Sequence, residues 1–264
     1  MPTMIQQLRA INPVVLTVAN MVTPADVANA VNAIGASPIM SSSPEEAAEM
    51  TQLASAVTLN LGTLNQLQKQ EILAVIKAAE KFQKPIVIDP VAAALPYRHQ
   101  FIMSLLSQHH VTVIRGNAGE IASLAGMKWQ SHGIDSGSGD QAQLSNIAMT
   151  CARQYGCVVA LTGPTDIISD GRKTVINHLG TSLFQTYVGC GDMISSVVAA
   201  FLAVGDDPLQ STAAAIRTFT AAGQIVEEKL PAKLPGTFFT ALLDELYQID
   251  DQQVSARVHE DRAD

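Results

Sequence analysis

The residues Gly189, Cys190, Gly191 and Asp192 stand directly before an apolar segment that runs to Val204. A helix there would present unpaired backbone N–H groups and a partial positive charge at its first turn. Glycines let such a backbone approach a ligand closely, so these four residues predict an anion hole for phosphate oxygens. Asp192 at its mouth is the kind of group that accepts the proton of an attacking hydroxyl. The structural alternative is that Asp192 only caps the helix and the glycines form a tight turn.

Polar residues in three other segments suit the same chemistry. In RGNAGE, Arg115 could bind nucleotide phosphates and Glu120 could hold Mg²⁺ through water, or the two could form an ordinary surface ion pair. Thr162, in LTGPTD, fits a strand-to-hairpin turn as well as a nucleotide contact. Asp89, in PIVIDP, could help to place the metal or could simply be the turn residue before a proline.

These residues must be positioned by a chain in which strand-like and helix-like patterns alternate. We expect strands at residues 14–18, 56–61, 85–90, 111–117 and 157–163, and a hairpin at 166–177. Helices are predicted at residues 24–34, 44–54, 67–82, 99–108, 118–126, 144–154, 193–204, 209–229 and 238–247. This alternation predicts an α/β fold, a central mostly parallel sheet with helices on both faces, which binds ligands at the carboxyl ends of its strands.

The outline of the chain favours one domain over residues 1–250, a polar loop at 128–140 and a flexible charged tail at 251–264. The net charge of −8 argues against nucleic-acid binding. Three cysteines and the absence of a signal-like N-terminus predict a cytoplasmic protein. The longest apolar segment is too short to span a bilayer, so no membrane association is expected.

Taken together, these motifs resemble the hydroxyethylthiazole kinase family of the ribokinase-like superfamily. The matching pieces are GASPIM (35–40), LNLGTL (59–64), IDPV (88–91), IRGNAGEIASLAG (114–126), GID (133–135), LTGPTDIISDG (161–171) and GCGD (189–192). The resemblance implies a ribokinase-like fold, ATP and Mg²⁺ as cofactors, and transfer of the γ-phosphoryl group to the hydroxyl of 5-(2-hydroxyethyl)-4-methylthiazole. It also implies a homotrimer with active sites between subunits.

The resemblance further implies roles for single residues. These are thiazole contacts for Met40 and Gly189, a place for Asn20 in the thiazole pocket, ATP contacts for Arg115 and Thr162, metal binding by Asp89 and Glu120, and proton acceptance by Asp192.

The sequence departs from the family pattern at several positions. The family commonly has Cys where this chain has Asp192, whereas the wider superfamily has Asp there as its general base. Leu16 and Ala19 stand in place of a usual His and Thr, and Ala92 and Ala94 in place of glycines. Three alternatives therefore stay open: a sibling kinase of hydroxymethylpyrimidine or pyridoxal, a non-catalytic binding protein of this fold, and a nucleotide-dependent dehydratase acting on a hydrated nicotinamide nucleotide.

Overall fold

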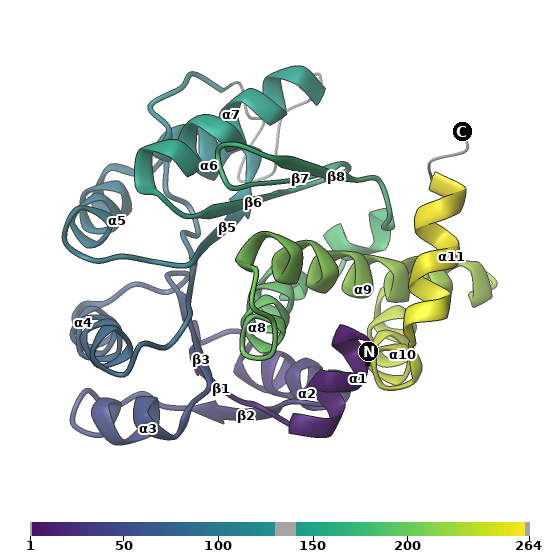
Figure 1. Cartoon of the computed structure of the whole chain (residues 1–264), viewed down its shortest axis with the longest axis horizontal. Helices are drawn as coiled ribbons and strands as arrows, with labels where there is room; N and C mark the ends of the chain where they lie inside the picture. The colour runs from purple at the N-terminus through teal and green to yellow at the C-terminus, as the bar shows by residue number, and fades with distance from the viewer. Residues whose placement is uncertain (1, 130–140, 262–264) are drawn as a thin grey trace.

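The computed structural model describes residues 2–129 and 141–261, which fold around one eight-stranded sheet (Figure 1). The strand order is β2-β1-β3-β4-β5-β6-β7-β8, and every pair up to β5–β6 is parallel, whereas β7 and β8 run antiparallel to their neighbours. The strands are β1 (Val14–Val18), β2 (Ser37–Met40), β3 (Ala56–Asn60), β4 (Ile86–Asp89), β5 (Val113–Asn117), β6 (Val158–Thr162), β7 (Asp166–Ser169) and β8 (Thr174–Asn177).

Helices cover both faces of the sheet (Figure 1). One layer contains α3 (Ala47–Leu53), α4 (Gln66–Lys81), α5 (Pro96–Gln108), α6 (Ala118–Leu124) and α7 (Gln141–Tyr155). The other contains α2 (Pro24–Ile34), α8 (Cys190–Leu202) and α9 (Pro208–Lys229), with α1 (Met4–Ile11), α10 (Pro235–Gln248) and α11 (Asp251–Asp261) outside them and a short 3₁₀ turn, η1 (Ser182–Gln185), before α8. No helix among the described residues is long and apolar enough to cross a membrane.

The two faces of the sheet have separate hydrophobic cores. On β4, Val87 belongs to the core under α8, while Ile86 and Ile88 belong to the core under α4 and α5. Side chains alternate between the faces of a strand, and both faces are buried here. This explains why the strands read as continuous apolar runs in the sequence.

The predicted fold class is confirmed, but two short elements near the N-terminus, β2 and α1, were not predicted. Strand β2 has only four residues, includes Pro38, and pairs with β1 at the edge of the sheet, where a proline is tolerated. Helix α1 is short, and a capping box between Thr3 and Gln6 stabilises its first turn. Short elements of this kind leave little periodic pattern to read.

The C-terminal segment also differs from the prediction. Where we expected a flexible tail, the structure has helix α11, which packs against α9. Val254 and Val258 pack against the core, and Arg257 forms a two-bonded ion pair with Glu228 of α9. The sequence analysis missed this helix because its apolar face consists of few residues in a mostly charged segment. The GID match at 133–135 lies outside the described residues, as does all of the predicted loop at 128–140 except residues 128 and 129. The one-domain organisation stays a prediction.

Candidate active site

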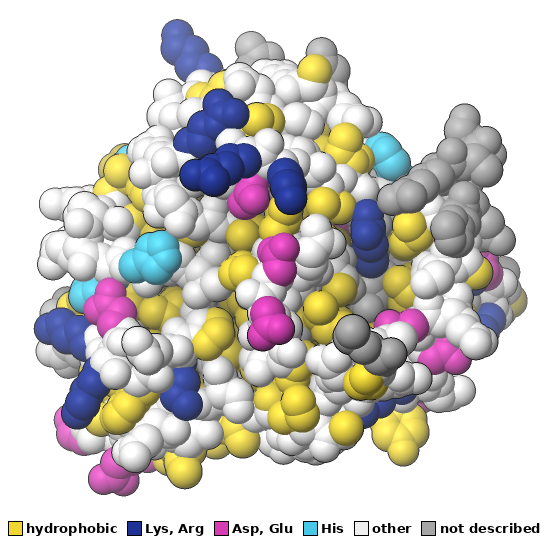
Figure 2. Space-filling model, viewed as in Figure 1, with side chains coloured by type: hydrophobic (Ala, Val, Ile, Leu, Met, Phe, Trp, Pro, Cys, Tyr) yellow, Lys and Arg dark blue, Asp and Glu magenta, His cyan; other side chains and the backbone are white. Residues whose placement is uncertain are grey.

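A cavity of about 670 Å³ lies at the carboxyl ends of the parallel strands, beside the N-terminus of α8. Every predicted site residue except Met40 lines it. In the space-filling view, acidic side chains occupy the middle of the visible face and hydrophobic ones surround them (Figure 2). The topology of the sheet therefore brings the predicted residues together at the edge where the sequence placed them.

Met40 is the exception. It ends the edge strand β2, pairs in register with Thr17, and its half-buried side chain packs against the core under α2 and α8. It is not among the residues that line the cavity of its own chain. The structure of one chain thus separates Met40 from Gly189, although the resemblance gives both a thiazole contact.

The N-terminus of α8 has the backbone form that the GCGD sequence predicts. Gly189 precedes the helix with φ +107°, in the left-handed region that favours glycine. A Cβ at Gly191 would lie 2.8 Å from Nη1 of Arg115, so a glycine there also lets the guanidinium approach the helix. The first N–H groups of a helix have no intrahelical partners, and the residues at the start of α8 line the cavity.

Asp192 lies in the first turn of α8, three residues after the N-cap Gly189. Its Oδ2 accepts hydrogen bonds from Asn20 Nδ2 at 2.8 Å and Thr23 Oγ1 at 2.5 Å. Its Oδ1 accepts one from Asn60 Nδ2 at 2.8 Å. Since the carboxylate bonds to side chains of other elements and does not cap α8, the capping alternative is wrong.

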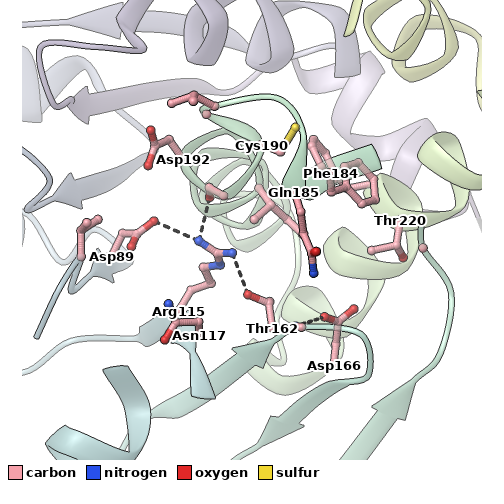
Figure 3. Close-up of a pocket in the computed structure, with 18 of the residues that line it drawn as sticks. Asp89, Arg115, Asn117, Thr162, Asp166, Phe184, Gln185, Cys190, Asp192 and Thr220 are labelled. Carbon is pink, nitrogen blue, oxygen red and sulfur yellow. Dashed lines mark hydrogen bonds and ion pairs between the residues drawn. The ribbon is translucent and has the colours of Figure 1, made fainter. Parts of the chain in front are cut away.

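Arg115 lies at the centre of the site and connects three elements. Its Nη1 donates to Asp89 Oδ2 at 3.2 Å and to the carbonyl of Gly191 at 3.0 Å, and its Nη2 donates to Thr162 Oγ1 at 2.6 Å. Figure 3 shows the guanidinium between Asp89 and Thr162. Arg115 therefore fixes the ends of β4 and β6 relative to the start of α8, with its charge at the cavity.

Two buried carboxylates, Asp89 and Glu120, stand on the floor of the cavity. Burial raises the pKa of Asp89 to about 7 against the opposing effect of Arg115, and the nearby charges of Glu120 and Asp192 raise it further. Burial also raises the pKa of Glu120. The alternative of a surface ion pair for Glu120 is wrong, because its oxygens accept the backbone N–H groups of Ala92 and Asn117 at 2.8 Å each.

The opposite end of the cavity carries aromatic side chains. Figure 3 shows Phe184 and Thr220 on the side of Arg115 away from Asp192. The ring of Phe184 stacks on Phe219 with centroids 5.3 Å apart. The cavity thus joins an acidic, hydrogen-bonded end to an aromatic end, with Arg115 and Thr162 between them.

The structure adds contacts for residues to which the sequence analysis assigned no role. Asp166, also lining the cavity, accepts from Gly163 N at 3.0 Å and Asn177 Nδ2 at 2.8 Å, and burial raises its pKa to about 6. Ser195 donates to Asp89 Oδ2 at 2.7 Å. Thr23 stands one residue before the predicted helix at 24–34, and its hydroxyl donates to Asp192. Two of these residues had a signal in the sequence: Asp166 follows the predicted strand at 157–163, and Ser195 lies one turn after Asp192 on the same helix.

Cys190 is buried in the predicted anion hole. Burial raises the pKa of its thiol to about 12. Because the thiolate is the reactive form, this cysteine contributes no nucleophile at neutral pH.

The fold and the place of the cavity define a ribokinase-like protein. A ribokinase-like superfamily protein from Enterococcus faecalis superposes with a TM-score of 0.63 at 16% identity, covering 89% of this chain and 86% of that one. A pyridoxal kinase from Bacillus subtilis, solved as an ADP complex, superposes with a TM-score of 0.59 at 18% identity, covering 80% and 91%.

Closer relatives define the family. The family model of hydroxyethylthiazole kinases matches residues 5–252. A protein named hydroxyethylthiazole kinase from Limosilactobacillus fermentum is 49% identical over 97% of this chain and 99% of its own length. One from Lactiplantibacillus plantarum is 51% identical over 92% and 93%. The solved hydroxyethylthiazole kinase protein from Pyrococcus horikoshii OT3 is 35% identical with a TM-score of 0.87, covering 96% and 94%. The chain belongs to the hydroxyethylthiazole kinase family.

Proposed function

We propose that this chain transfers the γ-phosphoryl group of ATP to the hydroxyl of 5-(2-hydroxyethyl)-4-methylthiazole, a step of thiamine biosynthesis. The observation that carries the proposal is the placement of Asp192 at the start of α8. A carboxylate held by three side chains stands beside backbone N–H groups at one end of a cavity that Arg115 divides. This arrangement supplies a proton acceptor next to an anion site, as phosphoryl transfer requires.

ATP is proposed to lie along the part of the cavity between Arg115 and the aromatic end. Its phosphates would contact Arg115 and Thr162, and its base would lie at the aromatic end near Phe184. A guanidinium binds phosphate oxygens well because it is planar and always charged. The acceptor alcohol would then occupy the acidic end, lined by Asn20 and Gly189.

Mg²⁺ fits the acidic floor of the site. In phosphoryl-transfer sites this ion is usually held by one or two carboxylates together with phosphate oxygens and water. Asp89 and Glu120 are two such carboxylates, and burial raises the pKa of each. They would hold the ion through water, and its charge would neutralise the nucleotide phosphates.

The chain's own groups accept the proton and stabilise the charge of the transferring phosphoryl group. Asp192 accepts the proton of the alcohol, whose oxygen attacks the γ-phosphorus in line. The first N–H groups of α8, from Gly189 to Asp192, form the anion hole that stabilises charge on the transferring group. Arg115 holds the same charge from the side of the nucleotide. Catalysis in this scheme is positioning and electrostatics.

A homotrimer with shared active sites is also proposed. Two observations support the trimer. Met40 lies outside the cavity of its own chain, and exposed apolar side chains lie at the rim of that cavity. Val22 and Val188 at the cavity are 65% and 71% exposed, and the adjacent Met21 is 74% exposed. Exposed apolar groups at a rim are typical of surfaces that another chain covers.

A cytoplasmic location is proposed as well. Cys151, Cys157 and Cys190 are buried and free of disulfides. Reduced thiols are typical of proteins in a reducing compartment.

The test of the proposed reaction uses Asp192→Asn. We expect its kcat for the thiazole alcohol to fall by about 10²- to 10⁴-fold, the usual contribution of a positioned proton acceptor. ADP release would be measured with the thiazole alcohol, hydroxymethylpyrimidine and pyridoxal. Unchanged turnover in the variant would refute the role of Asp192. Faster turnover of either rival alcohol by the native chain would refute the proposed acceptor.

A further inference from the structure

The hydrogen bonds around Asp192 form a directed network that the family resemblance did not include. Asn20 lies in the loop after β1, Thr23 stands before α2, and Asn60 ends β3. All three donate to the Asp192 carboxylate, from positions 172, 169 and 132 residues away in the chain. Two segments of the sheet edge, the loop between β1 and α2 and the end of β3, thus converge on one side chain.

Backbone groups fix the direction of each amide. Asn20 Oδ1 accepts the N–H groups of Val22 at 2.7 Å and Thr23 at 3.1 Å, so its Nδ2 must face Asp192. Asn60 Oδ1 accepts the N–H of Gly62 at 2.8 Å and one hydrogen of Asn20 Nδ2 at 3.3 Å. Neither amide can flip without breaking these bonds, so both present donors to the carboxylate.

The Thr23 side chain does not cap the helix that it precedes. It is the N-cap residue of α2, where a Thr side chain normally accepts an N–H of the first turn. Here the hydroxyl makes no capping bond and donates instead to Asp192 Oδ2 at 2.5 Å. The methyl group of Thr23 lies against Gly189, where an added Cβ would come within 2.8 Å of it. The residue therefore contacts both ends of the GCGD turn.

The network leaves the two carboxylate oxygens unequal. Oδ2 accepts two hydrogen bonds, which occupy its two lone pairs, whereas Oδ1 accepts one. We propose that Thr23 and Asn60 are positioning residues that, with Asn20, orient Asp192 so that Oδ1 receives the proton of the acceptor alcohol. This inference rests on the proposed function.

The balance of the step follows from that geometry. The O–H bond of the alcohol breaks and its proton passes to Oδ1. The alcohol oxygen forms a bond to the γ-phosphorus, and the bond from that phosphorus to the bridging oxygen breaks, leaving ADP. The Thr23 hydroxyl has two acceptors within reach, Asp192 Oδ2 at 2.5 Å and Asn20 Oδ1 at 3.3 Å. The shorter contact takes its single proton, so Thr23 acts through Asp192.

The test compares Thr23→Val, which keeps the shape and removes the hydroxyl, with Thr23→Ser, which restores the hydroxyl. We expect Thr23→Val to lower kcat by roughly 10- to 100-fold, the range of one hydrogen bond to a charged group. KM for ATP and for the alcohol should stay within about twofold, because the lost bond acts on the reacting step. Thr23→Ser should recover most of kcat.

Thr58→Val is the matched control. Thr58 lies on β3 two residues before Asn60, and its buried hydroxyl has no hydrogen-bond partner among the described residues. The same substitution there should leave kcat unchanged. A wild-type kcat in Thr23→Val, or a loss in Thr23→Val that Thr23→Ser does not recover at equal melting temperature, would overturn the proposal.

Asp192→Asn separates this inference from the proposed function. If Asp192→Asn retains native turnover, the role of Asp192 itself is refuted. If Asp192→Asn is inactive while Thr23→Val is normal, only the positioning role fails. The double variant Thr23→Val/Asp192→Asn should be no slower than Asp192→Asn alone, since Thr23 acts through the carboxylate. A further loss in the double variant would contradict the proposal.

Discussion

Gly189 and Gly191 are separated by one residue and are glycines for different physical reasons. Gly189 has φ +107°, and a Cβ there would also lie 2.8 Å from the methyl carbon of Thr23. Gly191 has an ordinary helical backbone, but a Cβ there would meet the guanidinium of Arg115. The sequence motif therefore encodes a backbone conformation at one position and a close side-chain approach at the other.

At the residue scale, we expect Gly189→Ala to lower the free energy of unfolding by about 2–4 kcal/mol. The left-handed backbone costs roughly 1–2 kcal/mol for a residue with a Cβ, and the contact with Thr23 adds overpacking. Urea unfolding measures the loss. Gly126→Ala is the control, because Gly126 also has positive φ, +66°, but an added Cβ would meet no atom of residues 2–129 and 141–261 within 4 Å. Equal losses in both variants would show that the approach of Thr23 to Gly189 is not tight.

At the scale of elements, the loops after β3 and β4 are held by one side chain of α5. Arg98 donates through Nη1 to the carbonyls of Leu61 and Val91, and through Nη2 to the carbonyl of Gly62 at 2.6 Å. Gly62 and Val91 line the cavity. Arg98 thus ties two neighbouring strand ends to the first turn of a helix that does not reach the cavity.

We expect Arg98→Met to lower the free energy of unfolding by about 2–4 kcal/mol, because a half-buried, charge-assisted set of hydrogen bonds is lost. Arg257→Met is the matched control. It removes a two-bonded pair with Glu228, whose side chain is 53% exposed, and such pairs contribute about 0–1 kcal/mol. Denaturant unfolding of both variants measures the two losses in the free energy of unfolding. A loss in Arg98→Met no larger than in the control would contradict the role of Arg98.

At the scale of the whole molecule, the single chain holds an active-site cavity that lacks Met40. In a trimer with shared sites, Met40 of one subunit would meet Gly189 of the next. The apolar rim at Met21, Val22 and Val188 would then be covered by the neighbouring chain. Light scattering on the purified protein should give the mass of three chains.

Mixing variants tests whether the sites are shared. Met40→Gln keeps the length of the side chain and makes it polar, so it should raise KM for the thiazole alcohol without changing KM for ATP. Subunits carrying Met40→Gln and Asp192→Asn would be mixed in equal amounts, reassembled, and assayed at limiting alcohol. Random assembly should restore about one quarter of the native sites if each site takes Asp192 from one chain and Met40 from another. No gain over the separate variants would argue against shared sites.

Much of this molecule follows from local sequence rules. The alternation of apolar runs and helical patterns predicted the parallel sheet, and the apolar segment after the glycines predicted the start of α8 to within three residues. The expectation that ligands bind at the carboxyl ends of parallel strands placed four residues at one edge of the sheet: Asp89, Arg115, Glu120 and Thr162. These features depend on periodicity and backbone preference over a few residues, which a single sequence displays directly.

The tertiary structure decided which of those residues touch and what their contacts do. The hydroxyl of Thr23 could have capped its own helix, and it bonds to Asp192 only because β1 and the start of α8 are neighbours in space. Glu120 could have been a surface acid, and its burial under the β4–α5 loop changed its chemistry. Hydrogen bonds and desolvation act over a few ångströms of space, so residues more than a hundred positions apart acquire a shared chemistry only when the sheet closes around them.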